Sequence, residues 1–147
     1  MKWIAPVWAF LMLGLTIGGA VAAENRMLPA SKPEVKADIV ASVEGQLAAF
    51  REGQIEKAYA YASTVLQMQT PFRQFVQLVR QGYPEIWSNV RVEFGLVRDD
   101  GRRATATARV FAQDGSSAPY DYVLVKEDDF WRIVGVLRHQ AKGETRV

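Results

Sequence analysis

The spacing of apolar residues changes at Asn89, and this change limits which folds the chain can adopt. Before Asn89, apolar residues recur every three or four positions, as on the buried face of an α-helix. After Asn89 they alternate with polar residues, as in a strand that buries one face. The sequence therefore predicts a helical first part that packs on a sheet formed by the second part.

Three helices are expected in the first part. They cover residues 33–52, 54–63 and 70–82, and a further helical turn covers 84–87. In the longest helix the apolar residues share one face, Ser31 is expected to cap the start, and Gly53 ends it. The polar connection around Met68 is expected to be a solvated loop, with a surface for a partner as the alternative.

Four strands are expected in the second part. They cover residues 89–98, 103–113, 119–126 and 130–139. Short runs of Asp, Gly and Ser separate them, which is typical of hairpin turns. Because no helical pattern interrupts the strands, consecutive strands are expected to pair antiparallel. The predicted fold class is α+β, with three N-terminal helices packed on a four-stranded antiparallel sheet.

Residues 1–22 are expected to be a signal peptide. Lys2 gives a positive start, residues 3–23 carry no charge, and small residues at the end suit cleavage after Ala22 or Ala23. The alternative is an uncleaved anchor, since 21 uncharged residues are long enough to span a bilayer. In both cases the domain is expected outside the cytoplasm, either periplasmic or secreted, or anchored there by residues 3–23.

The remainder is short enough to form one domain. We expect a tether at 23–32, a single domain at 33–139 and a polar tail at 140–147. With 18 basic and 16 acidic residues, the near-neutral charge is not that of a nucleic-acid-binding protein. The chain has no cysteine and one histidine, so neither a disulfide nor a thiolate or histidine metal cluster is expected, and no cofactor is predicted.

The sequence contains few candidates for acid–base chemistry. The single histidine, His139, is interpreted as an exposed residue near the end of the last strand. Asp121 lies between Tyr120 and Tyr122, and it would be an interior carboxylate only if the two tyrosines faced water. The surface position is favoured for Asp121, because unpaired acids are seldom buried, so it is only a weak catalytic candidate.

Two further charged residues raise the same question of direction. Glu93 is expected outside, because its neighbours form the more apolar row of the strand. Arg109 stays open between the two faces, and an inward position for it would imply an anionic ligand.

Four stretches of the sequence carry a family resemblance. They are Gln46–Phe50, Ala58–Ser63, Phe75–Val79 with Gly82–Pro84, and Trp131–Val136. In these stretches the chain resembles DUF4864, a bacterial family of domains of unknown function in the NTF2-like, or cystatin-like, α+β superfamily. The resemblance implies a strongly twisted sheet that forms a cone closed on one side by the helices. Gln54 stands where the family pattern often has an acidic residue.

The same resemblance suggests a place for a ligand. A cone-shaped sheet leaves space at its mouth, and six aromatic residues are candidates to line it: Tyr59, Tyr83, Trp87, Phe94, Tyr122 and Trp131. The alternative is that these side chains only fill the core of a small domain. Fold analogy alone transfers no catalytic residue to this chain.

Two functions follow as hypotheses. The first is non-catalytic binding of a small apolar ligand or a protein partner by an exported domain, with contact to a membrane only through an uncleaved signal segment. A homodimer through the outer sheet face is possible within it, with Thr105, Thr107 and Tyr120 as candidate contacts. The second is a small isomerase- or cyclase-type enzyme that uses a pocket acid such as Asp121 and a tyrosine.

Overall fold

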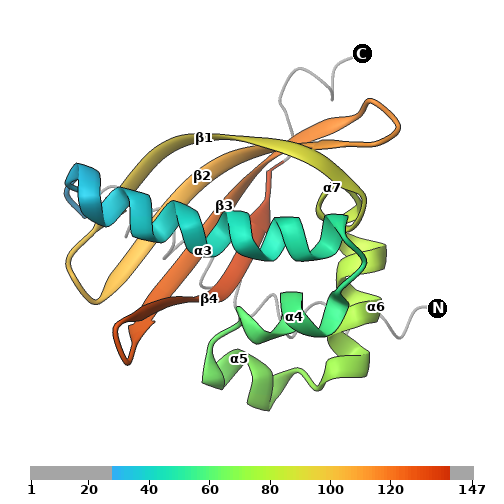
Figure 1. Cartoon of the computed structure of the whole chain (residues 1–147), viewed down its shortest axis with the longest axis horizontal. Helices are drawn as coiled ribbons and strands as arrows, with labels where there is room; N and C mark the ends of the chain where they lie inside the picture. The colour runs from blue at the N-terminus through green and yellow to red at the C-terminus, as the bar shows by residue number, and fades with distance from the viewer. Residues whose placement is uncertain (1–27, 140–147) are drawn as a thin grey trace.

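The computed structural model describes residues 28–139 and confirms the α+β fold class (Figure 1). The helices of this part are α3 (Pro33–Arg51), α4 (Ile55–Ala60), α5 (Thr64–Gln69), α6 (Phe72–Gly82) and α7 (Pro84–Trp87). The strands are β1 (Asn89–Asp99), β2 (Arg103–Ala112), β3 (Ser117–Glu127) and β4 (Phe130–Arg138). The predicted signal peptide at 1–22 and the polar tail at 140–147 lie outside the described residues.

The long helix α3 forms where the sequence predicts it. Its face of Ile39, Val43 and Leu47 is buried against the sheet, and Gly53 follows it with φ +73°, a conformation that favours glycine. The predicted Ser31 cap is wrong. Lys32 occupies the N-cap position without a side-chain hydrogen bond, while the Ser31 hydroxyl donates to Asp99 instead.

The connection expected to be a loop contains the short helix α5. The α4 helix ends at Ala60, because residues 61–63 pair with β4 at the edge of the sheet: Ser63 N–H donates to Ile133 O, and Ile133 N–H donates to Tyr61 O. The Ser63 hydroxyl then accepts a hydrogen bond from Leu66 N–H and caps α5. The prediction of a loop was wrong because it overlooked this cap.

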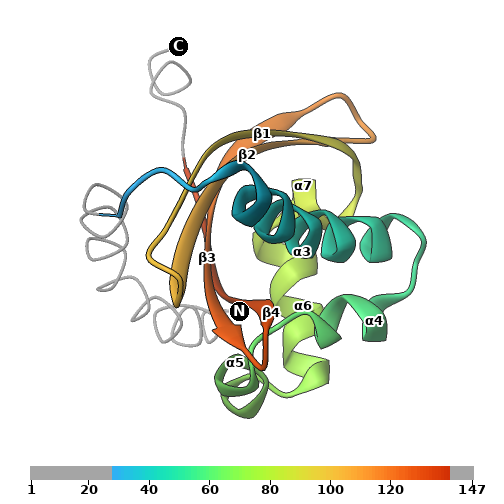
Figure 2. The same cartoon turned by 60° about the vertical axis from the view of Figure 1, so that its left-hand side comes forward.

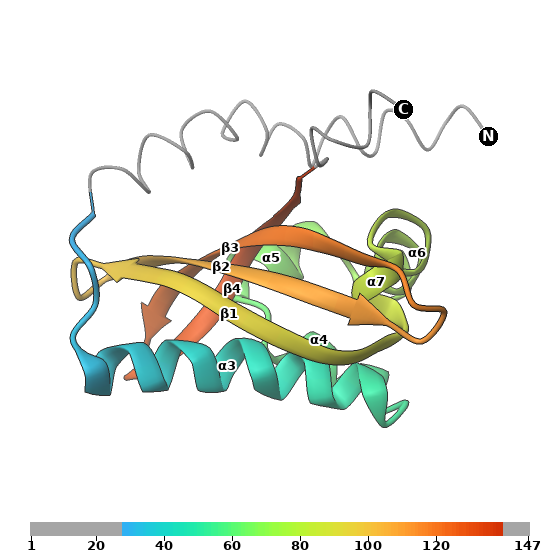
Figure 3. The same cartoon turned by 90° about the horizontal axis from the view of Figure 1, so that it is seen from above.

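The four strands form one antiparallel sheet in the order β1-β2-β3-β4, as the sequence predicts. The sheet curves around α3, which lies across its concave face (Figures 2 and 3). The inner face carries the alanine row of β2 and, opposite it, the row of β3 that contains Tyr120 and Tyr122. The outer face carries Thr105, Thr107 and Asp121. Tyr120 is fully buried under the helices and Thr105 is buried on the outer face, so neither is available as the dimer contact suggested above; Thr107 is half-buried.

Three register shifts interrupt the strand pairing, and two of them show how the inward-facing residues change. In β1 the register shifts between Phe94 and Val97, so that Val97 is buried and Leu96 is exposed, against the simple alternation. In the β3–β4 pair the shift lies between Val123 and Leu124, and Val136 packs on the core instead of Leu137. A strict alternation of two cannot predict such shifts. Each shift adds an extra residue to one strand, so the side chains that follow it point to the opposite face of the sheet.

Part of the expected tether is packed on the domain. Leu28 is buried, Ala30 bridges to Arg98 of β1, and Ser31 N–H donates to Val97 O. Residues 28–31 therefore cover one end of the β1 edge. Among the helices of residues 28–139, none is both long enough and apolar enough to cross a membrane.

Candidate functional site

Two tyrosines dominate the inner face of the sheet. Tyr120 stands opposite Ala108, and Tyr122 stands opposite Ala106 of β2. Both tyrosine side chains are fully buried. The pairing of a large ring with a methyl group gives each ring the space that it needs beneath the helices. The pattern of the two strands thus points the phenols into the interior, which the alternation of apolar residues in β3 did not decide.

The hydroxyl of Tyr122 is the unusual group of this interior. It is fully buried, and within residues 28–139 no protein atom hydrogen-bonds with it. Burial raises the pKa of Tyr122 well above its usual value, and the nearby Tyr83 and Glu44 raise it further. The group is therefore a neutral phenol that can both donate and accept a hydrogen bond. Buried polar groups of proteins are normally paired, so this hydroxyl calls for an explanation.

Tyr120, by contrast, belongs to a closed polar network. Its hydroxyl donates to Glu85 Oε1 over 2.7 Å, and Arg138 donates to both oxygens of Glu85, with Nη2 at 2.7 Å from Oε2. The Arg138 hydrogen bond lowers the pKa of Glu85 and outweighs the effect of burial, and the bond from Tyr120 lowers it further. Glu85 is thus an interior anion whose two oxygens are already engaged, which suits a structural role better than proton transfer.

Sequence reasoning missed Glu85. It follows Pro84 at the start of α7. Acidic residues are common in the first turn of a helix, because the positive end of the helix dipole stabilises their charge. No periodicity in a four-residue helix shows that this side chain turns inward. The one usable signal is Arg138, a basic residue on a strand that otherwise faces the helices with apolar side chains.

Tyr83 lies beside this network. Its ring centroid is 5.9 Å from that of Tyr120, and its hydroxyl donates to Val136 O over 3.2 Å. Burial raises the pKa of Tyr83 to about 12. Tyr83 also adds to the rise of the Tyr122 pKa, which brings two of the six predicted pocket residues into one part of the interior.

The other four predicted pocket residues lie elsewhere in the same core. Tyr59 packs on Phe75 and donates to backbone oxygens of residues 67 and 70. Trp87 of α7 packs on Phe50 of α3. Phe94 and Trp131 belong to β1 and β4. All six contribute to one hydrophobic core, yet they are distributed along it, and a solvent-open hollow at 53–57 has none of them in its lining.

Asp121 lies on the face of the sheet that is turned away from the helices. Its carboxylate is 2.6 Å from Nε2 of His139, which is exposed at the end of β4. Asp121 therefore does not face the interior, as a pocket acid would have to, but it is not the expected surface acid either, because it is buried on the outer face beside His139. Glu93 is exposed, as expected, and Arg109 also points outward, where it donates to Ser117. Among the described side chains, no three potential ligands converge on a metal-ion site.

A helical layer in the concavity of a curved four-stranded antiparallel sheet is the NTF2-like architecture. The structure resembles an NTF2-like protein of unknown function from Shewanella oneidensis MR-1, with a TM-score of 0.53 and 16% sequence identity over 71% of this chain and 98% of that one. At this identity the likeness concerns the fold alone. No curated protein matches the chain.

The sequence itself identifies the family. Residues 32–146 match the model of a domain of unknown function, DUF4864, and this match covers most of the chain. The protein therefore belongs to the DUF4864 family, as the resemblance of its four stretches predicted.

Proposed function

We propose that this domain binds, without catalysis, a small neutral ligand that is mostly apolar, in the interior between the sheet and α3. The observation that carries the proposal is the buried Tyr122 hydroxyl, for which the described part of the chain supplies no hydrogen-bond partner. A buried hydroxyl left unpaired costs about 1–3 kcal/mol. A ligand with one hydrogen-bonding group at this point would recover that cost and would be oriented by it.

The charges near Tyr122 favour a neutral ligand over an anion. The two cations nearest the interior are already paired with carboxylates: Arg51 with Glu44 over 2.6 Å, and Arg138 with Glu85 over 2.7 Å. An anionic ligand would lose its hydration on entry and would find both of these cations already engaged.

Binding is favoured over the alternative isomerase or cyclase activity. Asp121, the acid suggested for such a reaction, is on the outer face with His139. The interior acid, Glu85, is held by Arg138 and Tyr120, and its lowered pKa makes it a weak base.

We propose further that the domain acts outside the cytoplasm. The support is the sequence alone: one positive residue, an uncharged apolar run and small residues at 20–23. N-terminal sequencing of the protein from the periplasmic and extracellular fractions tests this. A start at Ala23 or Glu24 supports cleavage. An intact start at Met1 in the membrane fraction supports the anchor, and an intact start in the cytoplasm contradicts export.

Native mass spectrometry of the purified protein tests ligand binding. We expect an adduct of small-molecule mass in the wild type that is strongly reduced in Tyr122→Phe, because the variant loses the hydrogen bond and keeps the ring. Tyr120→Phe is the matched control: it removes a hydroxyl two residues away that is bonded to Glu85. An adduct of equal amount in Tyr122→Phe, or no adduct in any of the three proteins, would contradict the proposal.

A further inference from the structure

We propose that α5 and the turn of the β3–β4 hairpin form one docking surface for a basic, partly apolar segment of another protein. This α5–hairpin surface consists of three apolar residues, Val65, Met68 and Phe130, and three acidic ones, Glu127, Asp128 and Asp129. The inference does not depend on the proposed ligand, because none of these residues belongs to the interior.

Apolar exposure is concentrated at this surface. Five large apolar side chains are exposed in the described part of the chain, and three of them are here: Met68 at 77%, Phe130 at 64% and Val65 at 55%. The other two, Val90 and Leu96, lie on β1. Single exposed apolar residues are ordinary, but several on neighbouring elements mark a place where another molecule binds.

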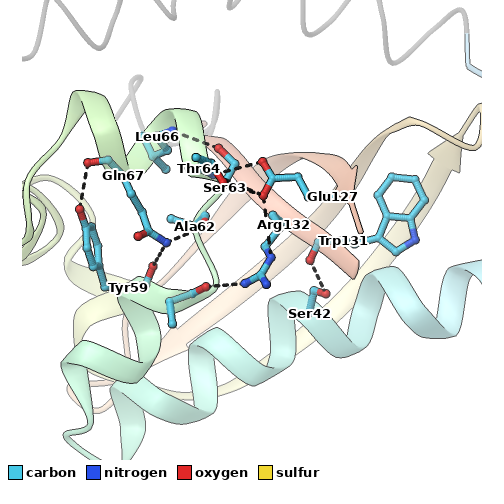
Figure 4. A network of polar contacts seen from close by, with 11 residues as sticks. Ser42, Tyr59, Ala62, Ser63, Thr64, Leu66, Gln67, Glu127, Trp131 and Arg132 are labelled. Atoms are coloured by element: carbon cyan, nitrogen blue, oxygen red, sulfur yellow. Dashed lines mark hydrogen bonds and ion pairs between the residues drawn. The ribbon is translucent and has the colours of Figure 1, made fainter. Parts of the chain in front are cut away.

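Direct contacts join α5 to the hairpin. The backbone N–H and the hydroxyl of Thr64 donate to the Glu127 carboxylate over 3.1 Å each, as Figure 4 shows. Glu127 is the antiparallel partner of Phe130, so the two side chains leave the same face of the hairpin. Arg132 shares that face: its guanidinium lies over the Phe130 ring at 5.9 Å. The α5 helix and the turn of the β3–β4 hairpin therefore lie side by side at one corner of the molecule (Figure 2).

The surface is held in place before any partner arrives. Ser63 caps α5 and pairs with Ile133, while Arg132 donates to Ala60 O over 2.7 Å. These contacts fix α5 against β4 through both backbone and side chains. A surface that is already ordered loses less conformational entropy on binding than a mobile loop would.

The charge of the surface selects the partner. Three carboxylates lie in and beside the hairpin turn, and the cations next to them are engaged: Arg132 Nε lies 4.0 Å from Glu127 Oε1 and its guanidinium donates to Ala60 O, while Lys126 lies over the Trp131 ring. Asp128 and Asp129 remain exposed at the turn with no ion pair among the described residues, so the turn itself is acidic, although the whole chain has a formal charge of +2. An anionic lipid surface would be repelled by it, whereas Lys or Arg residues beside apolar ones would be attracted. A basic protein segment is the partner that fits.

Site-specific photo-crosslinking in the producing cells tests the inference. A photoreactive amino acid is placed at Met68 or Phe130 of the full chain, and at Val90 or Leu96 as controls of similar exposure. We expect the first two positions to link the same partner through a segment rich in Lys or Arg, and the control positions to give little of that product. Adding the double change Asp128→Lys and Asp129→Lys should lower the yield about tenfold, equivalent to ~1.4 kcal/mol.

Several outcomes would overturn the proposal. They are equal yields at the control positions, adducts mainly to lipid, adducts to a second copy of this chain, and a partner segment without excess basic residues. An unchanged yield in the charge-reversed protein would also overturn it, provided that circular dichroism shows the fold intact. The two changed residues are exposed at a turn, so the fold is expected to persist.

Discussion

Tyr120 and Tyr122 are two positions apart on one face of β3 and differ in a single respect. Both rings are buried opposite an alanine, but among residues 28–139 only the hydroxyl of Tyr120 has a hydrogen-bond partner, Glu85. Sequence alternation correctly placed the two tyrosines on the same face. It could not show which hydroxyl is satisfied, because that depends on α7 and β4, which are distant in the sequence.

The two hydroxyls should therefore contribute to stability with opposite signs. In ligand-free protein, Tyr122→Phe should leave the free energy of unfolding unchanged or raise it by about 1 kcal/mol, since a buried hydroxyl without a partner is removed. Tyr120→Phe should lower it by about 1–2 kcal/mol, since Glu85 loses a donor. Urea denaturation of the stripped proteins measures both. A larger loss for Tyr122→Phe than for Tyr120→Phe would contradict this assignment.

Glu85 should make stability depend on acid pH. Its pKa is lowered in the folded protein, so the ionised form contributes stability above the ordinary carboxyl pKa, and that contribution is lost as pH falls through the folded pKa. Glu85→Gln should cost about 3 kcal/mol at pH 7, because Arg138 is left without its anion. The free energy of unfolding of Glu85→Gln should also fall less steeply than that of the wild type between about pH 5 and pH 3, because the variant has no carboxyl group to protonate at this position. Parallel slopes in denaturant titrations would rule out this role.

The backbone of the β3–β4 turn is strained at two residues. Asp128 and Asp129 have φ of +49° and +70°, in the left-handed region where glycine is favoured over aspartate. Asp129→Gly should raise the free energy of unfolding by about 1 kcal/mol. The midpoint of guanidinium denaturation measures the gain, and Gly115→Ala, at a turn glycine with φ +92°, should show a loss instead. A midpoint for Asp129→Gly below that of the wild type would contradict the strain argument.

At the scale of elements, periodicity predicts what is long and regular. The α3 helix and the four strands are visible in the sequence, because each buries one face over many residues. The α5 helix, the paired residues 61–63 and the register shifts are not visible. Each of these is too short for a period, or depends on a partner far along the chain. The interior polar network was missed for the same reason, since Glu85, Tyr120 and Arg138 meet only in the folded protein.

The cap of α5 should be measurable. Ser63→Ala removes the acceptor for Leu66 N–H and should cost about 1 kcal/mol of stability. Because α5 is short and little of it is buried, the loss should appear first as faster amide hydrogen exchange at 64–69, with the strands unaffected. Ser63→Asp, which can keep the cap, should retain slow exchange. Equal exchange in the wild type and in Ser63→Ala would show that the cap is dispensable.

At the scale of the whole molecule, the sheet is concave toward α3, and each of its two edge strands is partly covered by a short segment that precedes a helix. Residues 61–63 pair with β4, and residues 28–31 pair with the end of β1. Each segment occupies backbone donors and acceptors that an open edge would offer to another chain. Cutting the chain at residue 32, where the family match begins, would strip β1 of its cover and leave backbone groups able to recruit strands from neighbouring molecules. Shortened proteins made for solution study should therefore start before Leu28, because an uncovered edge of β1 would promote aggregation.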